Sequence, residues 1–303
     1  MKDRCAVCSS LHWQLFTTSF DRLFNRPENV WEIRRCQDCG FGWTSPSLPE
    51  KELIDHYPPN YLGDTIHTVD AFLSGKLQRS RSWRRETEKI KLLERHIAEG
   101  HILDVGCGDG KFLWGLDPHK WQRTGVDFAK ETLSVVASKI HDINLINGNI
   151  FSQKLQENQF DVITLWHVLE HLPNSLKVLE RAYKLLRPGG WIVISVPNFS
   201  SLQARLFGRY WYAIDVPRHL YHFSPNSLEI LLKKVNLQFQ KHLFFSPMAN
   251  IHSLKYSLVY WSEAYFGNRL PYYLLKPLLF AFPFIERWNK KYGMLTTIAR
   301  KDS

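Results

Sequence analysis

The sequence predicts an α/β protein with a parallel central sheet and a small metal-binding module near the N-terminus. Three observations predict it. Short apolar runs alternate with amphipathic segments after residue 100, a glycine-rich turn follows the first of these runs, and two Cys-x-x-Cys pairs lie near the start. We therefore divide the chain into a zinc-binding module at 1–49, a linker with a helical lead-in at 50–100, and an α/β domain at 101–303.

The composition is that of a globular protein with a basic surface. Of the 303 residues, 44% are hydrophobic and 22% are charged, and the formal net charge is +10. This excludes a disordered chain and suggests an anionic partner, such as nucleic acid, a membrane surface or a phosphorylated substrate. No apolar run reaches about 18 uncharged residues, and no signal-peptide pattern opens the chain. We therefore expect a cytoplasmic protein without a membrane-spanning helix.

The zinc-binding module depends on four cysteines, which form two Cys-x-x-Cys pairs separated by 27 residues: Cys5, Cys8, Cys36 and Cys39. Two thiolates at this spacing on a tight turn can reach one ion, and two such turns complete a tetrahedral zinc site. Gly40 suits the left-handed backbone of such a turn. We expect a structural zinc ion without an open position for chemistry. Two reduced pairs or two disulfides are the alternatives.

The linker begins with prolines and tyrosines around Tyr57, and its basic stretch at 79–85 leads into a helical pattern through Ile90 and Ile97. The basic stretch is either the solvated face of a linker helix or a contact with an anion. Beyond the linker, apolar runs predict the following strands: Ile102–Val105, Arg123–Val126, Asn144–Ile146, Asp161–Leu165, Trp191–Val196, Leu237–Phe245 and Leu295–Ala299. The segments between the first five of these read as helices, so the sheet is covered on both faces.

The glycine-rich turn contains Gly106, Gly108 and Gly110 and connects a strand to a helix. Glycines there let backbone amides approach a ligand without a side chain in the way. A dinucleotide-binding loop has its third glycine where this chain has Lys111. Asp104, two residues before the first glycine, would repel a pyrophosphate but attract an ammonium group. The turn therefore disfavours a dinucleotide.

Polar residues also end the next two strands. Asp127 can accept hydrogen bonds from both hydroxyls of a ribose, and Asn149 can contact an adenine edge. Together with the glycine-rich turn, this series resembles the class I S-adenosylmethionine-dependent methyltransferases of the bacterial small-molecule and sugar type, over about Glu88 to Gln240. The motifs that carry the resemblance are Leu103–Gly110, Gly125–Asp127, Gly148–Asn149, Asp161–His171 and Leu186–Gly190. One departure is Asn149, where many relatives have aspartate.

The resemblance implies a Rossmann-like seven-strand sheet with the last strand antiparallel, and S-adenosylmethionine as the cofactor. It places the methionine end of the cofactor near Asp104 and Gly106, the ribose at Asp127 and the adenine near Asn149. The cofactor-binding residues that it implies are Asp104, Gly106, Cys107, Gly108, Gly110, Asp127, Phe128, Asn149, Ile150, Trp166 and His167.

Glu170 and His171 follow the fourth predicted strand, where the methyl donor should face its acceptor. Histidine titrates near neutral pH and can take a proton from a hydroxyl or an acidic carbon. The resemblance supports proton transfer, because similar Leu-Glu-His segments occur in sugar C-methyltransferases. It also leaves a metal role open, although the acid-x-x-Glu-His pattern of related metal sites has His167 in its first position here. A structural role at a helix start is the third alternative.

The segment from Asp215 to Phe223 concentrates polar groups on the side where class I enzymes build the acceptor pocket, and we expect substrate contacts from Arg218, His219 and His222. We predict methylation on oxygen or carbon of a small molecule, such as a sugar, a glycolipid or a quinone-like acceptor. An RNA methyltransferase guided by the zinc module and a non-catalytic cofactor-binding module are the alternatives. We do not expect nucleic acid, because the Asn/Asp-Pro-Pro-Tyr signature of base methylation is missing.

Residues 248–292 are aromatic and apolar, and we interpret them as a helical insertion before the last strand. Lys276 and three prolines within 270–285 argue against a membrane-spanning helix. The insertion is either a lid or homodimer surface packed on the core, or a peripheral membrane contact through 251–288 that the positive net charge would assist.

Overall fold

The computed structural model describes residues 4–58, 64–243, 247–289 and 291–303. Its centre is a seven-stranded sheet of the order β10-β11-β8-β7-β4-β5-β6. The strands are β4 Gly100–Val105, β5 Trp121–Asp127, β6 Asn144–Asn147, β7 Phe160–Trp166, β8 Leu186–Pro197, β10 Leu237–Leu243 and β11 Met294–Lys301. Strands from β8 to β6 run parallel, and β11 is antiparallel to both of its neighbours. The predicted sheet with an antiparallel last strand is confirmed.

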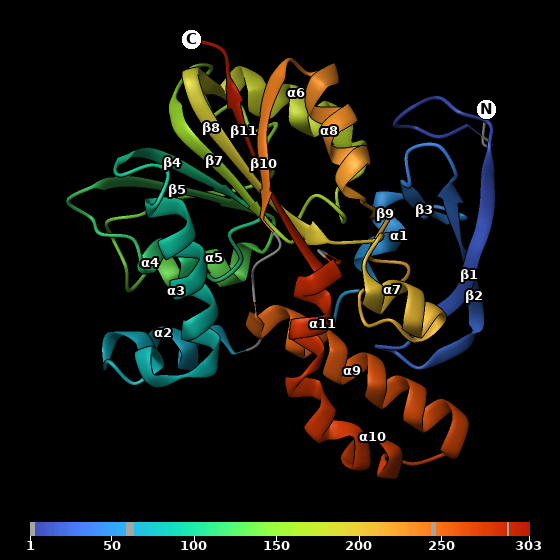
Figure 1. Cartoon of the computed structure of the whole chain (residues 1–303). Coiled ribbons are helices and arrows are strands. Elements are labelled where there is room, and N and C mark those ends of the chain that lie inside the picture. Colours follow the sequence, from blue (N-terminus) through green and yellow to red (C-terminus); the bar gives the residue numbers. More distant parts are fainter. Residues whose placement is uncertain (1–3, 59–63, 244–246, 290) are drawn as a thin grey trace.

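Helices cover both faces of this sheet (Figure 1). One face packs against α3 Arg81–Glu94, α4 Lys111–Trp114 and α5 Lys130–Ala137, and the other packs against α6 Ser175–Leu185 and α8 Pro225–Lys234. The basic stretch of the linker forms the start of α3, where the Ser80 hydroxyl caps the helix by accepting a hydrogen bond from the Trp83 amide. The other short helices are α1 Glu50–Ile54, α2 Thr65–Leu73, η1 Leu77–Arg79, α7 Leu202–Phe207 and η2 Gly208–Tyr210.

The strand boundaries differ from the prediction at two places. The fifth predicted strand begins at Trp191, whereas β8 already begins at Leu186. The register between β7 and β8 shifts between Phe160 and Val162, and Gly189 has a positive φ of 74°. Residues 187–190 lie between the paired Leu186 and Trp191 without a β7 partner, so they are the extra residues of a bulge. The predicted strand at 237–245 ends at Leu243, and residues 244 and 245 lie outside the described residues.

The N-terminal module is not a separate unit, because its sheet includes a strand from the α/β domain. The order of this second sheet is β1-β2-β3-β9, with β1 Trp13–Asp21, β2 Arg26–Cys36, β3 Gly42–Ser45 and β9 Tyr221–His222. Gly42 pairs with His222 and Trp43 pairs with Tyr221. The four cysteines pack in the same apolar cluster as the β8 and α8 side chains. The boundary that we expected at residue 49 is therefore crossed by a strand pair.

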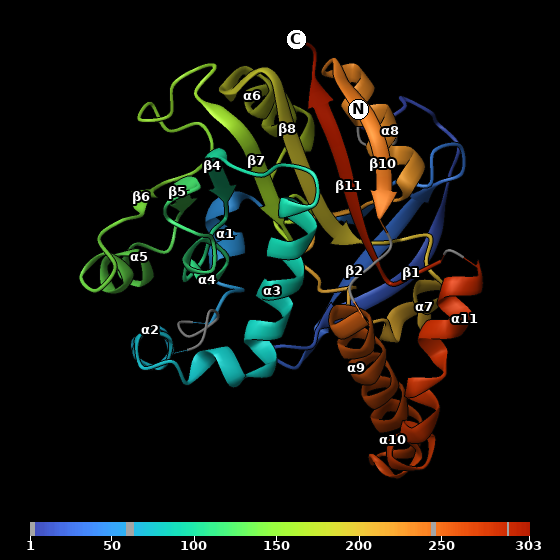
Figure 2. The same ribbon diagram turned by 60° about the vertical axis from the view of Figure 1, so that its left-hand side comes forward.

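The predicted insertion consists of α9 Pro247–Phe266, α10 Leu270–Leu275, η3 Lys276–Phe280 and α11 Phe282–Asn289. Figure 2 shows that these helices project from the body of the molecule below the sheet. Leu254 and Leu258 of α9 pack with Trp211 in a third apolar cluster, which is separate from the two clusters on the faces of the central sheet. Within the described residues, none of the helices combines the length and apolar character that crossing a bilayer requires.

Candidate functional site

The glycine-rich turn leaves β4 and runs directly into α4. Gly106, Gly108 and Gly110 all have positive φ angles, of 70°, 55° and 78°. A Cβ atom at Gly106 would lie 2.4 Å from Cγ2 of Val168, in the turn that follows β7. A side chain at this position would therefore clash as well as strain the backbone. Glycine is required here because the β4–α4 and β7–α6 connections approach each other closely.

Asp127 ends β5 and faces this turn. Its side chain is 7% exposed, and its two carboxylate oxygens accept hydrogen bonds from the Gly108 amide at 2.8 Å and the Ala129 amide at 2.9 Å. These bonds fix the carboxylate while each oxygen keeps a second acceptor position. The carboxylate therefore keeps the acceptor positions that the predicted ribose contact requires.

Asp104 lies in β4 beside the same turn and is 3% exposed. Burial raises its pKa to about 7, although the Thr164 hydroxyl donates a 2.6 Å hydrogen bond to its carboxylate and opposes this shift. A buried carboxyl group of this kind becomes ionised most readily when a cation binds next to it. Its environment fits the predicted contact with an ammonium group.

The remaining residues of the predicted cofactor site have mixed environments. Phe128 is 69% exposed, whereas Cys107, Ile150 and Trp166 are buried in the apolar clusters. The Trp166 indole Nε1 has no hydrogen-bond partner among the described residues. The Asn149 side chain is on the surface, and its oxygen accepts a 2.9 Å hydrogen bond from the Phe151 amide. The second lone pair of the Asn149 side-chain oxygen and the side-chain NH₂ group therefore remain available to hydrogen-bond an adenine.

The turn after β7 brings together three of the residues predicted to act on the acceptor. Glu170, His171 and His219 each present a ligand atom, and these three atoms lie within 4.8 Å of one another. Glu170 is 1% exposed, and neither of its carboxylate oxygens has a hydrogen-bond partner among the described residues. The nearby His167 has a positive φ of 58°, and its Nδ1 lies 3.7 Å from Glu170 Oε1. Non-glycine residues in this conformation concentrate at functional sites.

Burial and neighbouring charges set the protonation of this cluster. Burial lowers the pKa of His171 to about 4, so its ring is neutral near neutral pH. Burial opposes ionisation of Glu170, but the three nearby histidines outweigh it and hold the pKa of Glu170 below its ordinary value. The cluster thus combines a carboxylate with a neutral imidazole.

Arg218 has a different role from the predicted substrate contact. It is fully buried, and its guanidinium donates two hydrogen bonds to Asp21, at 3.2 and 3.0 Å, and two to Asp215, at 2.9 and 2.5 Å. A fifth bond of 2.8 Å goes to the His56 carbonyl. All five donors of the side chain are therefore occupied. Arg218 connects β1, the linker and the segment before β9, and it has no donor left for a substrate.

His222 is also displaced from the predicted substrate site. It is 3% exposed in β9, with its Nε2 3.3 Å from the Thr44 hydroxyl and its ring against Phe199. Burial lowers its pKa to about 3. His222 lies at the junction of the two sheets, with its ring centroid 6.4 Å from that of His219, and its Nε2 faces Thr44. We therefore correct the expected substrate contacts at Arg218 and His222 and retain His219.

Tyr57 is a site residue that our sequence interpretation missed. Its hydroxyl lies 3.1 Å from His171 Nδ1, and its ring centroid lies 6.2 Å from that of Phe128, the residue after Asp127. It therefore lies between the acceptor side and the cofactor side of the site. The aromatic and proline-rich start of the linker was visible in the sequence, but it gave no signal of which strand ends it would cover.

Loss of the Arg218 side chain should destabilise the protein severely. Arg218→Ala leaves Asp21 buried without its bidentate partner, and breaking a buried ion pair in this way costs about 3–5 kcal/mol. Urea denaturation followed by tryptophan fluorescence measures the change. Arg209→Ala is the matched control, because Arg209 is exposed and should have almost no effect. A stable Arg218→Ala protein that has lost only acceptor binding would restore our original interpretation of Arg218.

The four cysteines of the N-terminal module gather at one point. Their sulfur atoms lie within 4.8 Å of one another, with Cys5 3.6 Å from Cys39 and Cys8 3.5 Å from Cys36. Four thiolates around one zinc ion would be about 3.8 Å apart, given Zn–S bonds of about 2.3 Å. Gly40 has the expected left-handed backbone, with φ of 74°. The donor set and its spacing fit a closed zinc site.

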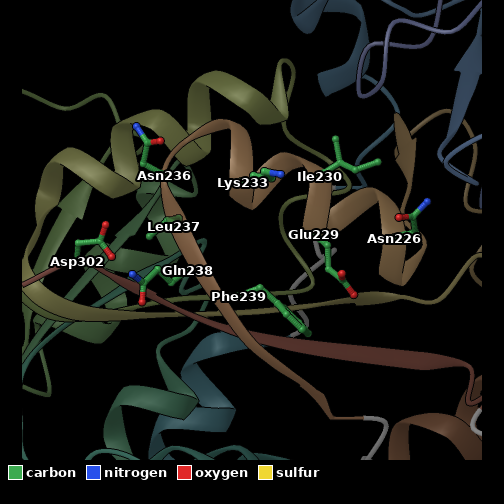
Figure 3. Close-up of a pocket in the computed structure, with 9 residues that line it drawn as sticks. All are labelled: Asn226, Glu229, Ile230, Lys233, Asn236, Leu237, Gln238, Phe239 and Asp302. Carbon is green, nitrogen blue, oxygen red and sulfur yellow. The ribbon is translucent and has the colours of Figure 1, made fainter.

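A surface hollow of about 470 Å³ lies away from all of these residues. It is formed by α8, β10 and the C-terminal tail, and Figure 3 shows Glu229, Lys233 and Phe239 around it. None of its lining residues belongs to the predicted site. It lies at the edge of the central sheet, whereas the site residues follow the carboxyl ends of β4, β5 and β7, where α/β folds bind ligands.

The sheet order and the glycine-rich turn define the class I methyltransferase fold, which agrees with two solved structures. The [4+2]-cyclase SpnF has a TM-score of 0.50 and 15% identity, covering 71% of this chain and 80% of its own. A protein from Bacillus halodurans C-125, described as a candidate methyltransferase, has a TM-score of 0.50 and 14% identity over 71% of this chain and all of its own. At this identity the likeness concerns the fold alone.

The model of the methyltransferase domain family matches residues 76–242, which is more than half of the chain. The chain therefore belongs to this family. A demethylmenaquinone methyltransferase from Oceanobacillus iheyensis is 32% identical over 159 residues, covering 49% of this chain and 63% of the relative. A ubiquinone biosynthesis O-methyltransferase from Hydrogenovibrio crunogenus is 27% identical over 149 residues, covering 45% and 61%. The chain thus spans less than two thirds of these curated relatives.

Proposed function

We propose that this protein transfers a methyl group from S-adenosylmethionine to a small-molecule acceptor. The observation that carries the proposal is the Asp127 carboxylate, which backbone amides of the glycine-rich turn and of Ala129 hold in place with acceptor positions to spare. S-adenosylmethionine would supply an electrophilic methyl group on its sulfonium. The chain supplies the binding and the alignment: Asp127 for the ribose, Asp104 for the ammonium group, and Gly106 for close backbone approach.

The acceptor side of the proposed site is the turn after β7. Glu170, His171 and His219 each bring an oxygen or nitrogen atom to within 4.8 Å of the others. A methyl acceptor bound beside this cluster would be complemented by it if the acceptor carries a proton donor. This favours a hydroxyl or an enol, and it supports methylation on oxygen or on an activated carbon. His171 and Glu170 remain our proposed catalytic residues.

The names of the curated relatives suggest a quinone-like acceptor for this chain, and the resemblance to sugar methyltransferases suggests a sugar or glycolipid. We propose a hydroxylated small molecule of either kind. RNA methylation is the second candidate, and it predicts RNA binding that weakens when Arg81, Arg84 and Arg85 are neutralised. A non-catalytic module is the third, because the fold itself is shared by a [4+2]-cyclase.

Calorimetric titration with S-adenosylmethionine and, separately, with NADH tests the proposal. We expect binding of S-adenosylmethionine alone, because Lys111 replaces the third glycine of a dinucleotide-binding loop. Candidate acceptors are then screened by the formation of S-adenosylhomocysteine. Binding of NADH alone would refute the proposed cofactor. Binding of S-adenosylmethionine without turnover on quinols, sugars or RNA would favour the non-catalytic module.

The affinity for S-adenosylmethionine should increase as the pH rises. The pKa of Asp104 is about 7 in the free protein, so its carboxyl is largely protonated at about pH 6 and must lose that proton when an ammonium group binds beside it. Affinity at about pH 6 should be roughly tenfold weaker than at about pH 7.5. Calorimetry in two buffers of different ionisation enthalpy measures the released proton. Asp104→Asn should abolish this release, and an unchanged pH profile in that variant would place the ammonium group elsewhere.

We further propose that the four-cysteine cluster holds a structural zinc ion. Cys5, Cys36 and Cys39 are buried, and their sulfurs gather with that of Cys8 at the spacing of a tetrahedral site. Zinc would supply cross-linking of the two turns and no chemistry, because four thiolates leave no open position. The chain's own contribution is the apolar packing of this cluster against α8.

The helical insertion is our proposed contact with an anionic membrane surface, which makes the protein a peripheral cytoplasmic one. Exposed apolar side chains gather on its helices: Tyr265, Phe266, Leu270, Tyr273, Leu274, Phe284 and Ile285. Lys276 is exposed among them and would complement anionic headgroups, whereas Arg269 is also exposed but pairs with Glu263. A protein bound to a membrane through this surface could take a hydrophobic methyl acceptor from the lipid.

Co-sedimentation with vesicles tests this surface. Binding to vesicles with phosphatidylglycerol should exceed binding to pure phosphatidylcholine, and Leu274→Asp should reduce it, because Leu274 is 70% exposed on α10. Leu206→Asp is the control, since Leu206 is an exposed leucine of α7 outside the insertion. Equal sedimentation of the two variants, or a dimer in light scattering that Leu274→Asp dissociates, would contradict membrane contact and favour a homodimer surface.

A further inference from the structure

Four aromatic side chains form a column between the helical insertion and the acceptor side of the site. The members of this aromatic column are Tyr212, His252, Tyr256 and Tyr260. His252, Tyr256 and Tyr260 follow one another at four-residue spacing on α9, so they share one face of the helix over about 12 Å. The Tyr212 ring contacts all three, with centroid distances of 5.3, 5.5 and 6.4 Å. All four residues are half-buried, so part of each remains accessible to a ligand.

Backbone hydrogen bonds fix one end of the column beside the acceptor cluster, the group formed by Glu170, His171 and His219. The Tyr212 amide donates a 2.8 Å hydrogen bond to the Ser257 hydroxyl, which ties this segment to α9. The carbonyl of the next residue, Ala213, lies 2.8 Å from His219 Nδ1, and it accepts this hydrogen bond because a carbonyl has no proton to donate. Tyr212 is therefore one residue away from the contact that orients His219.

The carboxylate of Asp215 acts on rings of both the acceptor side and the column. Burial raises the pKa of Tyr57, Tyr212 and Tyr260, and the charge of Asp215 is the next largest cause for each of them. The pKa of Tyr212 reaches about 12, so this ring is a neutral phenol near neutral pH. Asp215 is itself paired with Arg218, so its own charge is compensated. The acceptor side and the column therefore lie around one ion pair.

Helix α3 connects the column to the cofactor side of the site. The Lys89 Nζ lies 5.5 Å from the ring centroid of Trp166, one of the residues predicted to contact the cofactor. Arg85 lies one turn earlier on this helix. Burial raises the pKa of Tyr212 and lowers that of His252, and the charge of Arg85 acts on both rings. A molecule whose reacting group faces the methyl donor therefore has the column beside its remaining part.

The cations beside the column have no carboxylate partner of their own. Arg85 is exposed, and the Lys255 Nζ lies 4.9 Å from the ring centroid of Tyr256. Among the described residues, neither cation forms an ion pair with a carboxylate, in contrast to Arg269, which pairs with Glu263. Guanidinium and ammonium groups bind phosphates and carboxylates, and tyrosine rings pack against the faces of other rings. The surroundings of the column therefore complement a ring that carries a negative charge.

We propose that the aromatic column binds the part of the methyl acceptor that is not methylated, and that this part is a ring bearing a phosphate or carboxylate group. The assignment rests on the proposed methyltransferase function and narrows its acceptor to anionic ring compounds. A phosphorylated sugar and an aromatic carboxylate share this chemistry, because either ring can pack on Tyr256 while Arg85 and Lys255 bind the anion. An uncharged sugar or quinol would leave both cations without a partner.

Ligand-observed NMR with matched pairs of probes tests this acceptor class without any methyl transfer. Glucose 1-phosphate and glucose represent a sugar source, and 4-hydroxybenzoate and phenol represent an aromatic source. Saturation transfer from the full-length protein gives the Kd of each probe. In at least one pair, the anionic member should bind about tenfold more tightly than its neutral partner, because only the anion engages the cations of the column. The pair that shows this difference identifies the source of the ring.

Two variants assign the binding to the column. Tyr256→Leu removes a ring and Arg85→Gln removes a cation, and each should weaken binding of the anionic probe by roughly 3- to 10-fold. Tyr265→Leu is the matched control for the ring, because Tyr265 is a 66% exposed tyrosine of α9 outside the column. Arg84→Gln is the matched control for the charge, because Arg84 is the exposed neighbour of Arg85. Both control variants should bind the probe as the wild type does.

Calorimetry with S-adenosylmethionine on the same proteins separates this inference from the proposed function. Cofactor affinity that a variant retains shows that it is folded, and the exposed position of Arg85 keeps the test valid even where Tyr256→Leu fails to fold. Equal binding within both pairs, no binding of any probe, or wild-type affinity in Arg85→Gln overturns the anionic acceptor. Equal losses in Arg84→Gln and Arg85→Gln also overturn it, in favour of a diffuse basic surface. Probe binding that depends on the column in a protein without affinity for S-adenosylmethionine would refute the proposed cofactor alone.

Discussion

Replacing Cys36 and Cys39 by serine should lower the zinc content by one ion per chain and destabilise the protein more than any other change considered. Structural zinc sites contribute about 10–16 kcal/mol of apparent binding free energy in isolated zinc-finger peptides. Both residues are buried in the cluster that also contains side chains of α8, so the loss reaches the α/β domain. We expect the melting temperature to fall by about 10 °C or more.

The fifth cysteine provides the control for this experiment. Cys107 is outside the cluster, and Cys107→Ser should keep the zinc content of the wild type. Elemental analysis of the purified variants measures the zinc, and calorimetry measures the melting temperature. Unchanged metal content in the double variant would mean that the cysteines are two reduced pairs, and the zinc site would have to be abandoned.

Replacing Asp127 by alanine should weaken S-adenosylmethionine binding by about 10²–10⁴-fold. The carboxylate would provide two hydrogen bonds to the ribose, and hydrogen bonds to charged groups contribute about 1.5–3 kcal/mol each. It also holds the Gly108 amide, so the glycine-rich turn loses an anchor at the same time. Calorimetric titration measures the dissociation constant.

Asp161→Asn is the matched control for Asp127, because Asp161 is also an aspartate of a central strand. Asp161 lies near the amino-terminal end of β7, whereas Asp127 lies at the carboxyl end of β5. There Asp161 accepts hydrogen bonds from Arg187 and from the His101 amide. This variant should leave cofactor affinity unchanged even where it lowers stability. Equal affinity of Asp127→Ala and the wild type would contradict the assignment of the ribose and would reopen the choice of cofactor.

The central sheet was predictable because its signals are local. Each apolar run from Ile102 to Ala299 became a strand, since a strand buried on both faces is apolar throughout. The glycine-rich turn was predictable for the same reason, because Gly106 and Asp127 belong to short motifs. The start of β8 at Leu186 was missed, because Pro188, Gly189 and Gly190 indicate a turn, and only the β7 pairings of Leu186 and Trp191 on either side of them show that the strand continues.

The acceptor side was less predictable because distant residues decide it. Arg218 looks like an exposed substrate ligand in a polar loop, yet Asp21, 197 residues earlier, neutralises it in the interior. His222 likewise faces Thr44 rather than a substrate. The gathering of His219 with Glu170 depends on hydrogen bonds from the Leu220 and Tyr221 amides to the Glu170 carbonyl, which no short motif indicates.

The strand shared between the two sheets has a consequence for synthesis on the ribosome. β3 ends at Ser45, whereas its partner β9 begins at Tyr221, so roughly 10–40 s of translation separate the two at ordinary elongation rates. During this interval the nascent N-terminal segment has its cysteines and β1–β3 but lacks β9 and the Arg218 that neutralises Asp21. Metal capture by the two cysteine turns would protect this unfinished segment, and a chain that stalls before residue 218 would be exposed to proteases.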